Sequence, residues 1–370
     1  MFYFSKIDTP DFQKINNIIN NGIISGYNEA LPNPGYSGNG IFVSNLKNLE
    51  NKGEISGNSI IKTFDSNSEI KFGGLMSFTN GNGVVARYFP NLKITNSGKI
   101  TGKSIAGNFF PDDPNITPWP YYDGNGNGIY FNDNYNSREG TRGSGENTPL
   151  TVNNNGLVTG NAKYNALTER DDIISHYYSN GNGIAYEALI PSSTEFNIDH
   201  KINLDIDNIG LIKGYFSGER KFNILSDDRN KYLESRLAKA DGSGILFISE
   251  LEESSADINN KGLVSGNSDK RFGNGISLFS AHSRATSGYD LKGDFNIENS
   301  GIISGKENAI YLDKAEAHRP DYSRPPYPFP EIPNENIKLN INNYGILAGK
   351  NLVFVNNEKD NNKNIINNLE

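Results

Sequence analysis

Residues 18–26 read Ile-Ile-Asn-Asn-Gly-Ile-Ile-Ser-Gly, and the same spacing of residue types recurs seven more times along the chain. The shared pattern is Φ-x-Asn-x-Gly-x-Φ-x-Gly, where Φ is aliphatic and x is any residue. The central glycines that anchor the copies are Gly22, Gly53, Gly98, Gly156, Gly210, Gly262, Gly301 and Gly345. No copy departs from the pattern at a fixed position, which indicates a repeat architecture.

The alternation of residue types within each copy predicts short β-strands. Aliphatic residues at every second position put one side of a strand into a core. Asn and Gly between them predict a bend, because both tolerate positive φ and Asn hydrogen-bonds the local backbone. Two explanations of the fixed asparagines remain open. They form a ladder of side-chain amides along the stack, each bond contributing roughly 0.5–1.5 kcal/mol, or they serve turn propensity alone.

A second element follows each copy and completes one coil. It has the form Gly-Asn/Ser-Gly followed by an aliphatic strand, at residues 38–43, 81–85, 126–131, 181–186, 242–248 and 273–279, with reduced versions at 308–312 and 351–355. Three short strands with a bend at each corner make one coil, and coils stack by strand pairing. We therefore predict an all-β fold, a right-handed single-stranded parallel β-helix (solenoid) of about eight coils, forming one domain over residues 1–370.

The irregular spacing of the anchors supports this fold over other repeats. Successive anchors lie 31 residues apart from Gly22 to Gly53 but 58 apart from Gly98 to Gly156. Propellers and helical repeats keep a nearly fixed period, whereas a β-helix accommodates extra residues as surface loops. Only Asp228–Ala240 has a helical pattern, and it falls within one such loop.

Composition and charge narrow the class of function. The net charge is −8 with a pI near 5.2, and Lys and Arg do not cluster. Nucleic acid is therefore not an expected partner. The chain has no cysteine, which excludes disulfides and thiolate metal sites. The first residues lack a signal-peptide pattern, and residues 364–368 resemble the start of another coil. We expect a cytoplasmic protein or a fragment of a longer exported one, without a signal peptide or a separate membrane barrel.

Loops that interrupt the coils are the expected place for function, because loops on a rigid scaffold carry most binding residues. In coils two to five the insertion before the second element has about twenty or more residues, and stacking predicts one ridge on one side. Three acidic pairs lie in these loops: Asp112 and Asp113, Asp171 and Asp172, Asp227 and Asp228. Converging carboxylates bind Ca²⁺ or cleave polysaccharide. The alternative is that these pairs are ordinary solvated loop residues.

Aromatic and proline-rich loops provide the second candidate for binding. Residues 108–122 contain Trp119, Tyr121 and Tyr122, and residues 318–333 are similar in composition. Exposed aromatic side chains stack on sugars or anchor a partner protein. The alternative is that proline stiffens these loops and the aromatic rings pack onto the scaffold.

Patterns typical of an enzyme or a metal protein are weak in this chain. Its four histidines, His176, His200, His282 and His318, show no metal-ligand spacing. There is no nucleophile elbow or phosphate-binding loop, since the Gly-Asn-Gly-Asn-Gly of residues 124–128 is a coil corner. We predict no catalytic residue, no metal ligand and no cofactor, with Ca²⁺ as the one ion to consider.

The repeats resemble the passenger domains of type V autotransporter adhesins, in particular the Asn-rich surface proteins of fusobacteria. The residues that carry the resemblance are Asn-Asn-Gly-Ile-Ile-Ser-Gly at 20–26, Asn-Ser-Gly-Lys-Ile-Thr-Gly at 96–102 and their equivalents, each paired with Gly-Asn-Gly-Ile or a variant of it. The resemblance spans residues 18–355. It implies an exported β-helix displayed on the outer surface, acting in cell adhesion and virulence, and attached to the membrane only through a C-terminal barrel that is missing here.

The expected function is therefore that of a surface adhesin, a non-enzymatic interaction scaffold. Its partners would be host or bacterial surface proteins or glycans, bound through the loop insertions of the middle coils. A polysaccharide lyase or hydrolase is the alternative, because the same fold supports that chemistry. A tail fibre of the phage type is a third possibility, although no heptad segment that would drive its trimerisation is present.

Overall fold

The computed structural model confirms the predicted fold class. It describes residues 16–30, 38–44, 46–61, 76–78, 81–87, 91–106, 121–123, 126–132, 148–164, 181–188, 201–218, 241–249, 253–269, 272–280, 292–313, 315–316, 332–333, 337–356 and 364–368. All secondary structure in these ranges is β-strand. The predicted helix at 228–240 lies outside the described residues.

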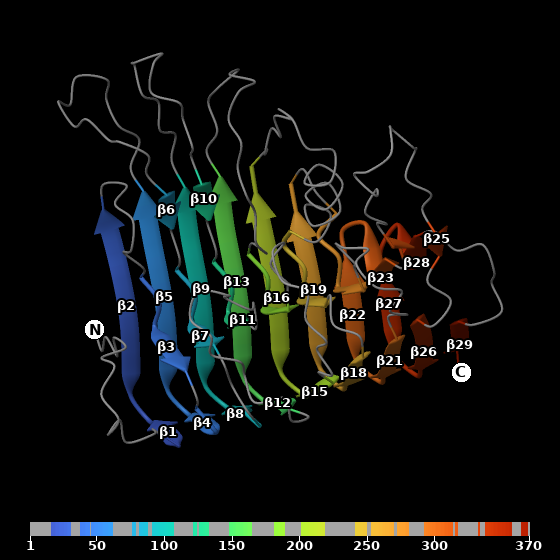
Figure 1. Ribbon diagram of the computed structural model, residues 1–370, viewed down its shortest axis with the longest axis horizontal. Helices are drawn as coiled ribbons and strands as arrows, with labels where there is room; N and C mark the ends of the chain where they lie inside the picture. The colour runs from blue at the N-terminus through green and yellow to red at the C-terminus, as the bar shows by residue number, and fades with distance from the viewer. Residues whose placement is uncertain are drawn as a thin grey trace, which may run out of the picture.

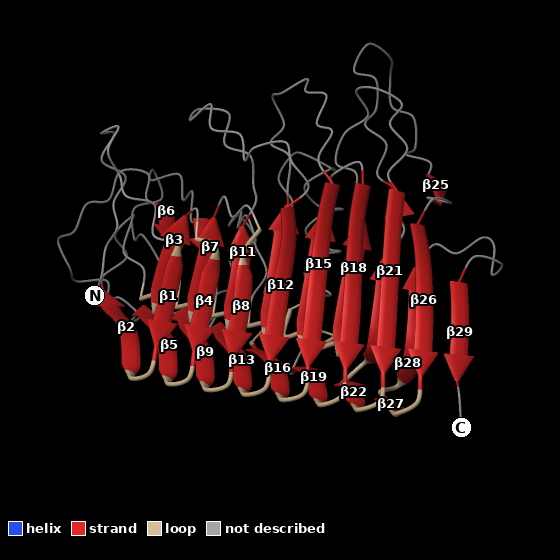
Figure 2. Cartoon of the chain, turned by 90° about the horizontal axis from the view of Figure 1, so that it is seen from below, coloured by secondary structure: helices blue, strands red, loops and turns tan. Residues whose placement is uncertain are grey.

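Three parallel sheets run the length of the molecule, with the first coil at one end and the last at the other (Figures 1 and 2). Sheet A contains β1 (Asn17–Asn20), β4 (Asn48–Asn51), β8 (Lys93–Asn96), β12 (Thr148–Asn154), β15 (Lys201–Asn208), β18 (Glu253–Asn260), β21 (Lys292–Asn299), β26 (Ile337–Asn343) and β29 (Asn364–Asn368). Sheet B contains β2 (Ile23–Ala30), β5 (Glu54–Ile61), β9 (Lys99–Ala106), β13 (Leu157–Tyr164), β16 (Leu211–Ser217), β19 (Leu263–Ser268), β22 (Ile302–Gly305) and β27 (Ile346–Ala348). Sheet C contains β3 (Ile41–Ser44), β7 (Val84–Arg87), β11 (Ile129–Asn132), β14 (Ile184–Ala188), β17 (Ile245–Ser249), β20 (Ile276–Ser280), β23 (Asn308–Asp313) and β28 (Asn351–Asn356).

Each coil contributes one strand to each sheet, in the order A, B, C. The corner between sheets A and B is the Asn-x-Gly of the first pattern, and the corner before sheet C is the Gly-Asn-Gly of the second. The strand β29 pairs in parallel with β26, with Ile366 opposite Ile341. The prediction that residues 364–368 begin another coil is therefore confirmed for their backbone.

The core is a set of rows, each built from one position of the repeat. On sheet A the inward row includes Leu49, Ile94, Val152, Ile206, Ile258, Ile297 and Ile341, all at most 2% exposed. On sheet B the equivalent row is Ile55, Ile100, Val158, Ile212, Val264 and Ile303, all fully buried. Larger rings fill the space beside sheet C, where Tyr186 and Phe247 stack with ring centroids 5.0 Å apart. Like residues thus pack on like residues from coil to coil.

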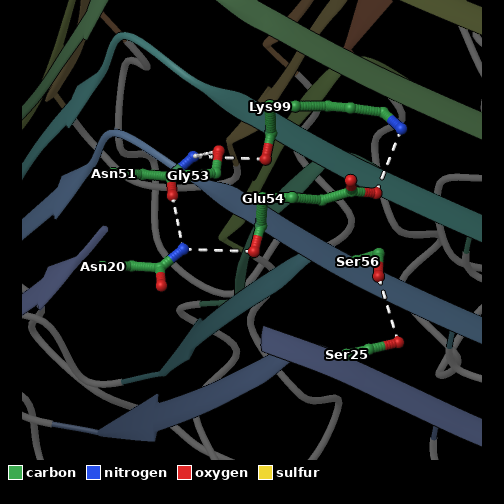
Figure 3. Close-up of polar contacts among 7 residues, drawn as sticks. All are labelled: Asn20, Ser25, Asn51, Gly53, Glu54, Ser56 and Lys99. Atoms are coloured by element: carbon green, nitrogen blue, oxygen red, sulfur yellow. Dashed lines mark hydrogen bonds and ion pairs between the residues drawn. The ribbon is translucent and has the colours of Figure 1, made fainter. Parts of the chain in front are cut away.

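The fixed asparagines form a continuous ladder, as the first of the two explanations predicts. Nδ2 of each asparagine donates to Oδ1 of the asparagine in the next coil at 2.7–2.8 Å, along Asn20, Asn51, Asn96, Asn154, Asn208, Asn260, Asn299 and Asn343. The same Nδ2 atoms donate to a backbone carbonyl of the next coil, such as Glu54 O or Lys99 O (Figure 3). Gly22 N–H also donates to Oδ1 of Asn20 at 3.2 Å. The asparagines therefore serve both the ladder and the local bend.

A second ladder runs along the corner before sheet C in the opposite sense. Here the backbone N–H of each coil donates to the asparagine Oδ1 of the preceding coil, at 2.8–3.0 Å, through Asn39, Asn82, Asn127, Asn182 and Ser243. After Ser243 the donors are side-chain amides. Nδ2 of Asn308 donates to Oδ1 of Asn274, and Nδ2 of Asn351 donates to Oδ1 of Asn308. The repeat is thus held at two corners by buried amides.

The anchor glycines serve close backbone contact, which corrects our prediction that they supply positive φ at the bend. Among the described residues positive φ occurs at Asn91, Gly181, Gly218, Gly242 and Gly273, and at none of the anchors. Of these, Gly181, Gly242 and Gly273 are the first glycines of the second pattern. A Cβ built on Gly98 would lie 2.1 Å from Gly53 O of the coil below, and one on Gly102 would lie 1.8 Å from Asn127 O. Glycine is required because backbone fills the space where a side chain would stand.

Candidate functional site

The insertions leave the scaffold between sheets B and C. In coil two β5 ends at Ile61 and β7 begins at Val84, and in coil three β9 ends at Ala106 and β11 begins at Ile129. In coil seven, by contrast, β22 ends at Gly305 and β23 begins at Asn308. The corner that joins the two sheets closes with two intervening residues there, so the scaffold itself does not need the insertions.

Two insertions continue the register of the scaffold. The short strands β6 (Met76–Phe78) and β10 (Tyr121–Asp123) pair in parallel, with Tyr121 opposite Met76 (Figure 1). This offset of 45 residues is also that of Glu54 and Lys99, which face each other in the scaffold strands before the insertions. The predicted alignment of the insertions is therefore confirmed for the backbones of residues 76–78 and 121–123, and the ridge as a whole stays a prediction.

Two of the predicted binding residues, Tyr121 and Tyr122, lie in this extra sheet. Their backbones pair with Met76 and Ser77 of β6, which joins the two insertions. Trp119, Asp112, Asp113, Asp171, Asp172, Asp227 and Asp228 lie outside the described residues. The convergence of the acidic pairs, and Ca²⁺ binding by them, therefore stay predictions. In the part of the chain that is described, no group of three His, Asp or Glu residues is placed to hold a metal ion.

Beside the insertions, the outer face of sheet C is buried in the middle coils. β17 and β23 are buried at every position, although their alternate residues face away from the core. On this outer face Tyr130 donates to Oε2 of Glu187 at 2.7 Å, and the two residues are 4% and 1% exposed. We did not predict this pair from the sequence. The available signal was the unbroken apolar composition of these strands, which is typical of two-sided burial.

A polar surface covers the outer face of sheet A. Asp205 of β15 lies opposite Asp257 of β18 and two positions from Asp207. Burial raises the pKa of the Asp205 carboxyl, and the charges of Asp207 and Asp257 raise it further. Amides moderate this repulsion, because Asn259 donates to Asp207 at 3.0 Å and Asn296 donates to Asp257 at 2.8 Å. We did not predict this surface, although the alternate spacing of the two aspartates in β15 places them on one face.

The outer face of sheet B carries a different set of residues. Lys99 Nζ and Glu54 Oε1 form an ion pair at 3.0 Å, and Ser56 donates to Ser25 at 3.1 Å (Figure 3). The ion pair is exposed, and such pairs contribute about 1 kcal/mol or less. Sheet B therefore presents a mixed surface of hydroxyl, amide and charged groups.

The fold defines a parallel β-helix repeat protein. Comparison with protein-family models, with curated proteins and with solved structures finds no match in any of the three. In the described part of the chain there is no helix of the length and apolarity needed to cross a membrane. The particular biological role is therefore argued from the residues themselves.

Proposed function

We propose that the chain is an interaction module, a rigid β-helix that presents the insertions of its middle coils to a protein or glycan partner. The observation that carries the proposal is the pairing of β6 with β10 in the register of the scaffold. Insertions that pair with one another form a continuous surface on a preformed support. A preformed surface binds with less loss of conformational entropy than independent loops.

The resemblance of the repeats to autotransporter passengers supports an exported, surface-displayed adhesin as the specific form of this proposal. In such a protein the coils supply length and rigidity, and specificity comes from what interrupts them. The ladder asparagines and core aliphatics are committed to the stack by their hydrogen bonds and burial. Partner contact is therefore assigned to the insertions and not to the repeat.

The decisive experiment removes the insertions of coils two and three while keeping the scaffold. Coil six connects Ser268 to Gly273 by residues 269–272, and the equivalent endpoints are Ser59 and Gly81 in coil two. Replacing residues 60–80 and 105–125 by the sequence of 269–272 gives a ridge-deleted variant. We expect binding to a glycan array and to host and bacterial cells to be lost, with the far-UV spectrum of a β-protein retained.

A matched control shortens a loop at another corner of the coil. Residues 133–147 join β11 to β12, and three residues perform the same connection between β3 and β4. The control variant with residues 133–147 replaced by residues 45–47 should keep its binding. Undiminished binding by the ridge-deleted variant would contradict the proposal. So would cleavage of uronate polysaccharides in the presence of Ca²⁺, seen as rising absorbance of unsaturated products.

A further inference from the structure

The corners of this fold contain Asn-Gly sequences, which are chemically reactive. The backbone nitrogen of the residue after an asparagine can attack its side-chain carbonyl carbon, and glycine leaves this attack unhindered because it has no side chain. Pairs in which both residues are described are Asn21-Gly22, Asn39-Gly40, Asn82-Gly83, Asn127-Gly128, Asn155-Gly156, Asn182-Gly183 and Asn274-Gly275. These pairs differ in how firmly the stack holds the two reacting groups.

The pairs in the second ladder are held at both groups. Gly83 N–H donates to Asn127 O of the next coil at 3.0 Å, which engages the nitrogen that would attack. Oδ1 of Asn82 accepts from the backbone N–H of Asn127 at 2.9 Å, which fixes the amide that would be attacked. Asn82, Asn127, Asn182 and Asn274 are fully buried. Reaction at these pairs requires the coils to separate.

The two pairs at the corner between sheets A and B have exposed asparagines but unequal surroundings. Gly156 N–H donates to Asn96 O of the coil below at 3.1 Å, and a Cβ at Gly156 would lie 2.1 Å from Gly98 O. At Gly22 nothing lies within 4 Å of such a Cβ. In the described chain β1 and β2 each have one neighbouring strand, β4 and β5. Among the described residues, Gly22 N–H donates to Oδ1 of Asn20 at 3.2 Å and to no backbone carbonyl.

We propose that Asn21 is a site of spontaneous deamidation in the folded protein, and that stacking protects the other described Asn-Gly pairs. The nitrogen of Gly22 bonds to Cγ of Asn21, and the Cγ–Nδ2 bond breaks with release of ammonia. Water then opens the resulting succinimide at either carbonyl and gives aspartate or isoaspartate. The product carries a new carboxylate at the corner next to the first amide of the ladder, and isoaspartate lengthens the main chain there by one methylene group.

The test is peptide mapping of the whole chain after prolonged incubation at mildly alkaline pH, native and in denaturant. In the native protein we expect conversion of Asn21 to be about two- to tenfold faster than that of Asn155, because the nitrogen of Gly156 must also break its bond to Asn96 O. Conversion of Asn21 should be at least about tenfold faster than that of Asn82 or Asn127, where the nitrogen and the amide are both held and the coils must separate. In denaturant the pairs should convert at similar rates. Conversion of the amide is detected by the mass difference between an amide and an acid, and isoaspartate is detected by enzymatic methylation.

Gly22→Ala provides the control variant, because the new Cβ meets open space while its bulk slows the attack of the nitrogen. This variant should unfold like the unchanged protein and lose most of the native-state conversion at Asn21. Two results would overturn the proposal. One is native conversion at Asn155 or at the buried pairs as fast as at Asn21, and the other is an unchanged Asn21 rate in Gly22→Ala.

Discussion

Asn154 shows at residue scale why the repeat tolerates no exception at its asparagine. Its side chain is fully buried, accepts from Asn96 Nδ2 at 2.8 Å and donates to Asn208 Oδ1 at 2.8 Å. A buried amide that connects two others cannot be removed without leaving both partners incompletely bonded. Leaving a buried polar group without its partner costs about 1–3 kcal/mol, in addition to the lost bonds.

We therefore expect Asn154→Ala to lower the free energy of unfolding by about 2–5 kcal/mol. The neighbouring Asn155 is exposed, so Asn155→Ala should change it by no more than about 0.5 kcal/mol. Denaturant titration followed by circular dichroism measures both. Equal effects of the two substitutions would show that the ladder does not stabilise the fold and that turn propensity accounts for the pattern.

Asp205 gives a prediction of pH dependence. Its pKa is raised above the ordinary value of 3.8, first by burial and then by Asp207 and Asp257. Between the unfolded and folded pKa values the folded chain binds more protons than the unfolded chain. The free energy of unfolding therefore decreases as the pH rises through that window. Above the window the full destabilisation by the ionised Asp205 carboxylate is present.

The substitution Asp205→Asn removes this penalty. At neutral pH it should stabilise the protein by up to about 1 kcal/mol, and the gain should disappear at a pH below 3.8. Glu298→Gln, on the same face, should give no comparable gain. Thermal unfolding at several pH values measures the difference, and a gain for Asp205→Asn that does not depend on pH would contradict the electrostatic explanation.

At the scale of elements, the second glycine of each repeat sets the distance between sheet B and the corner before sheet C. Gly102→Ala would place a Cβ 1.8 Å from Asn127 O, a backbone atom that cannot turn away. We expect a loss of about 3 kcal/mol or more, at or beyond the upper end of ordinary overpacking. Gly22→Ala is the matched control because its Cβ meets nothing within 4 Å. A loss at Gly102 no larger than at Gly22 would contradict this role.

Most of the strands could be predicted from the sequence because a repeated pattern constrains each coil many times. The aliphatic positions of the first pattern identify the inward rows of sheets A and B. The Gly-Asn-Gly pattern identifies where sheet C begins. The role of the anchor glycines was predicted incorrectly, because close approach of two backbones depends on how coils stack and not on local conformation. Burial of Tyr130 and Glu187 was missed for a similar reason, since the pattern describes only the core side of a strand.

The candidate site was less predictable because it lies in the interruptions of the repeat. In-register stacking of the coils allowed the ridge to be predicted, and the pairing of β6 with β10 confirms the alignment for the backbones of those two strands. Each insertion has its own sequence, so no second copy tests what its residues do. This is why Trp119 and the acidic pairs stay predictions while the asparagine ladder is established at every step.

At the scale of the whole molecule, the fold depends on parallel, in-register stacking of successive coils. Thr101 of β9 lies opposite Thr159 of β13, and Lys163 lies opposite Ile105. Neighbouring strands lie about 4.8 Å apart, which is within the Cα separation of a disulfide, roughly 4.4–6.8 Å. Four residues along a strand correspond to about 13 Å, which is too far for a disulfide. The absence of natural cysteine makes the chain well suited to this comparison.

The most direct measurement of the stack is therefore disulfide formation in two double variants under mild oxidation. We expect an intramolecular disulfide in T101C/T159C and none in T101C/K163C, read out by mass spectrometry of the digested protein. Both variants should keep the circular dichroism spectrum of the parent protein. Formation of the disulfide in T101C/K163C, or its absence from T101C/T159C, would contradict the in-register parallel β-helix.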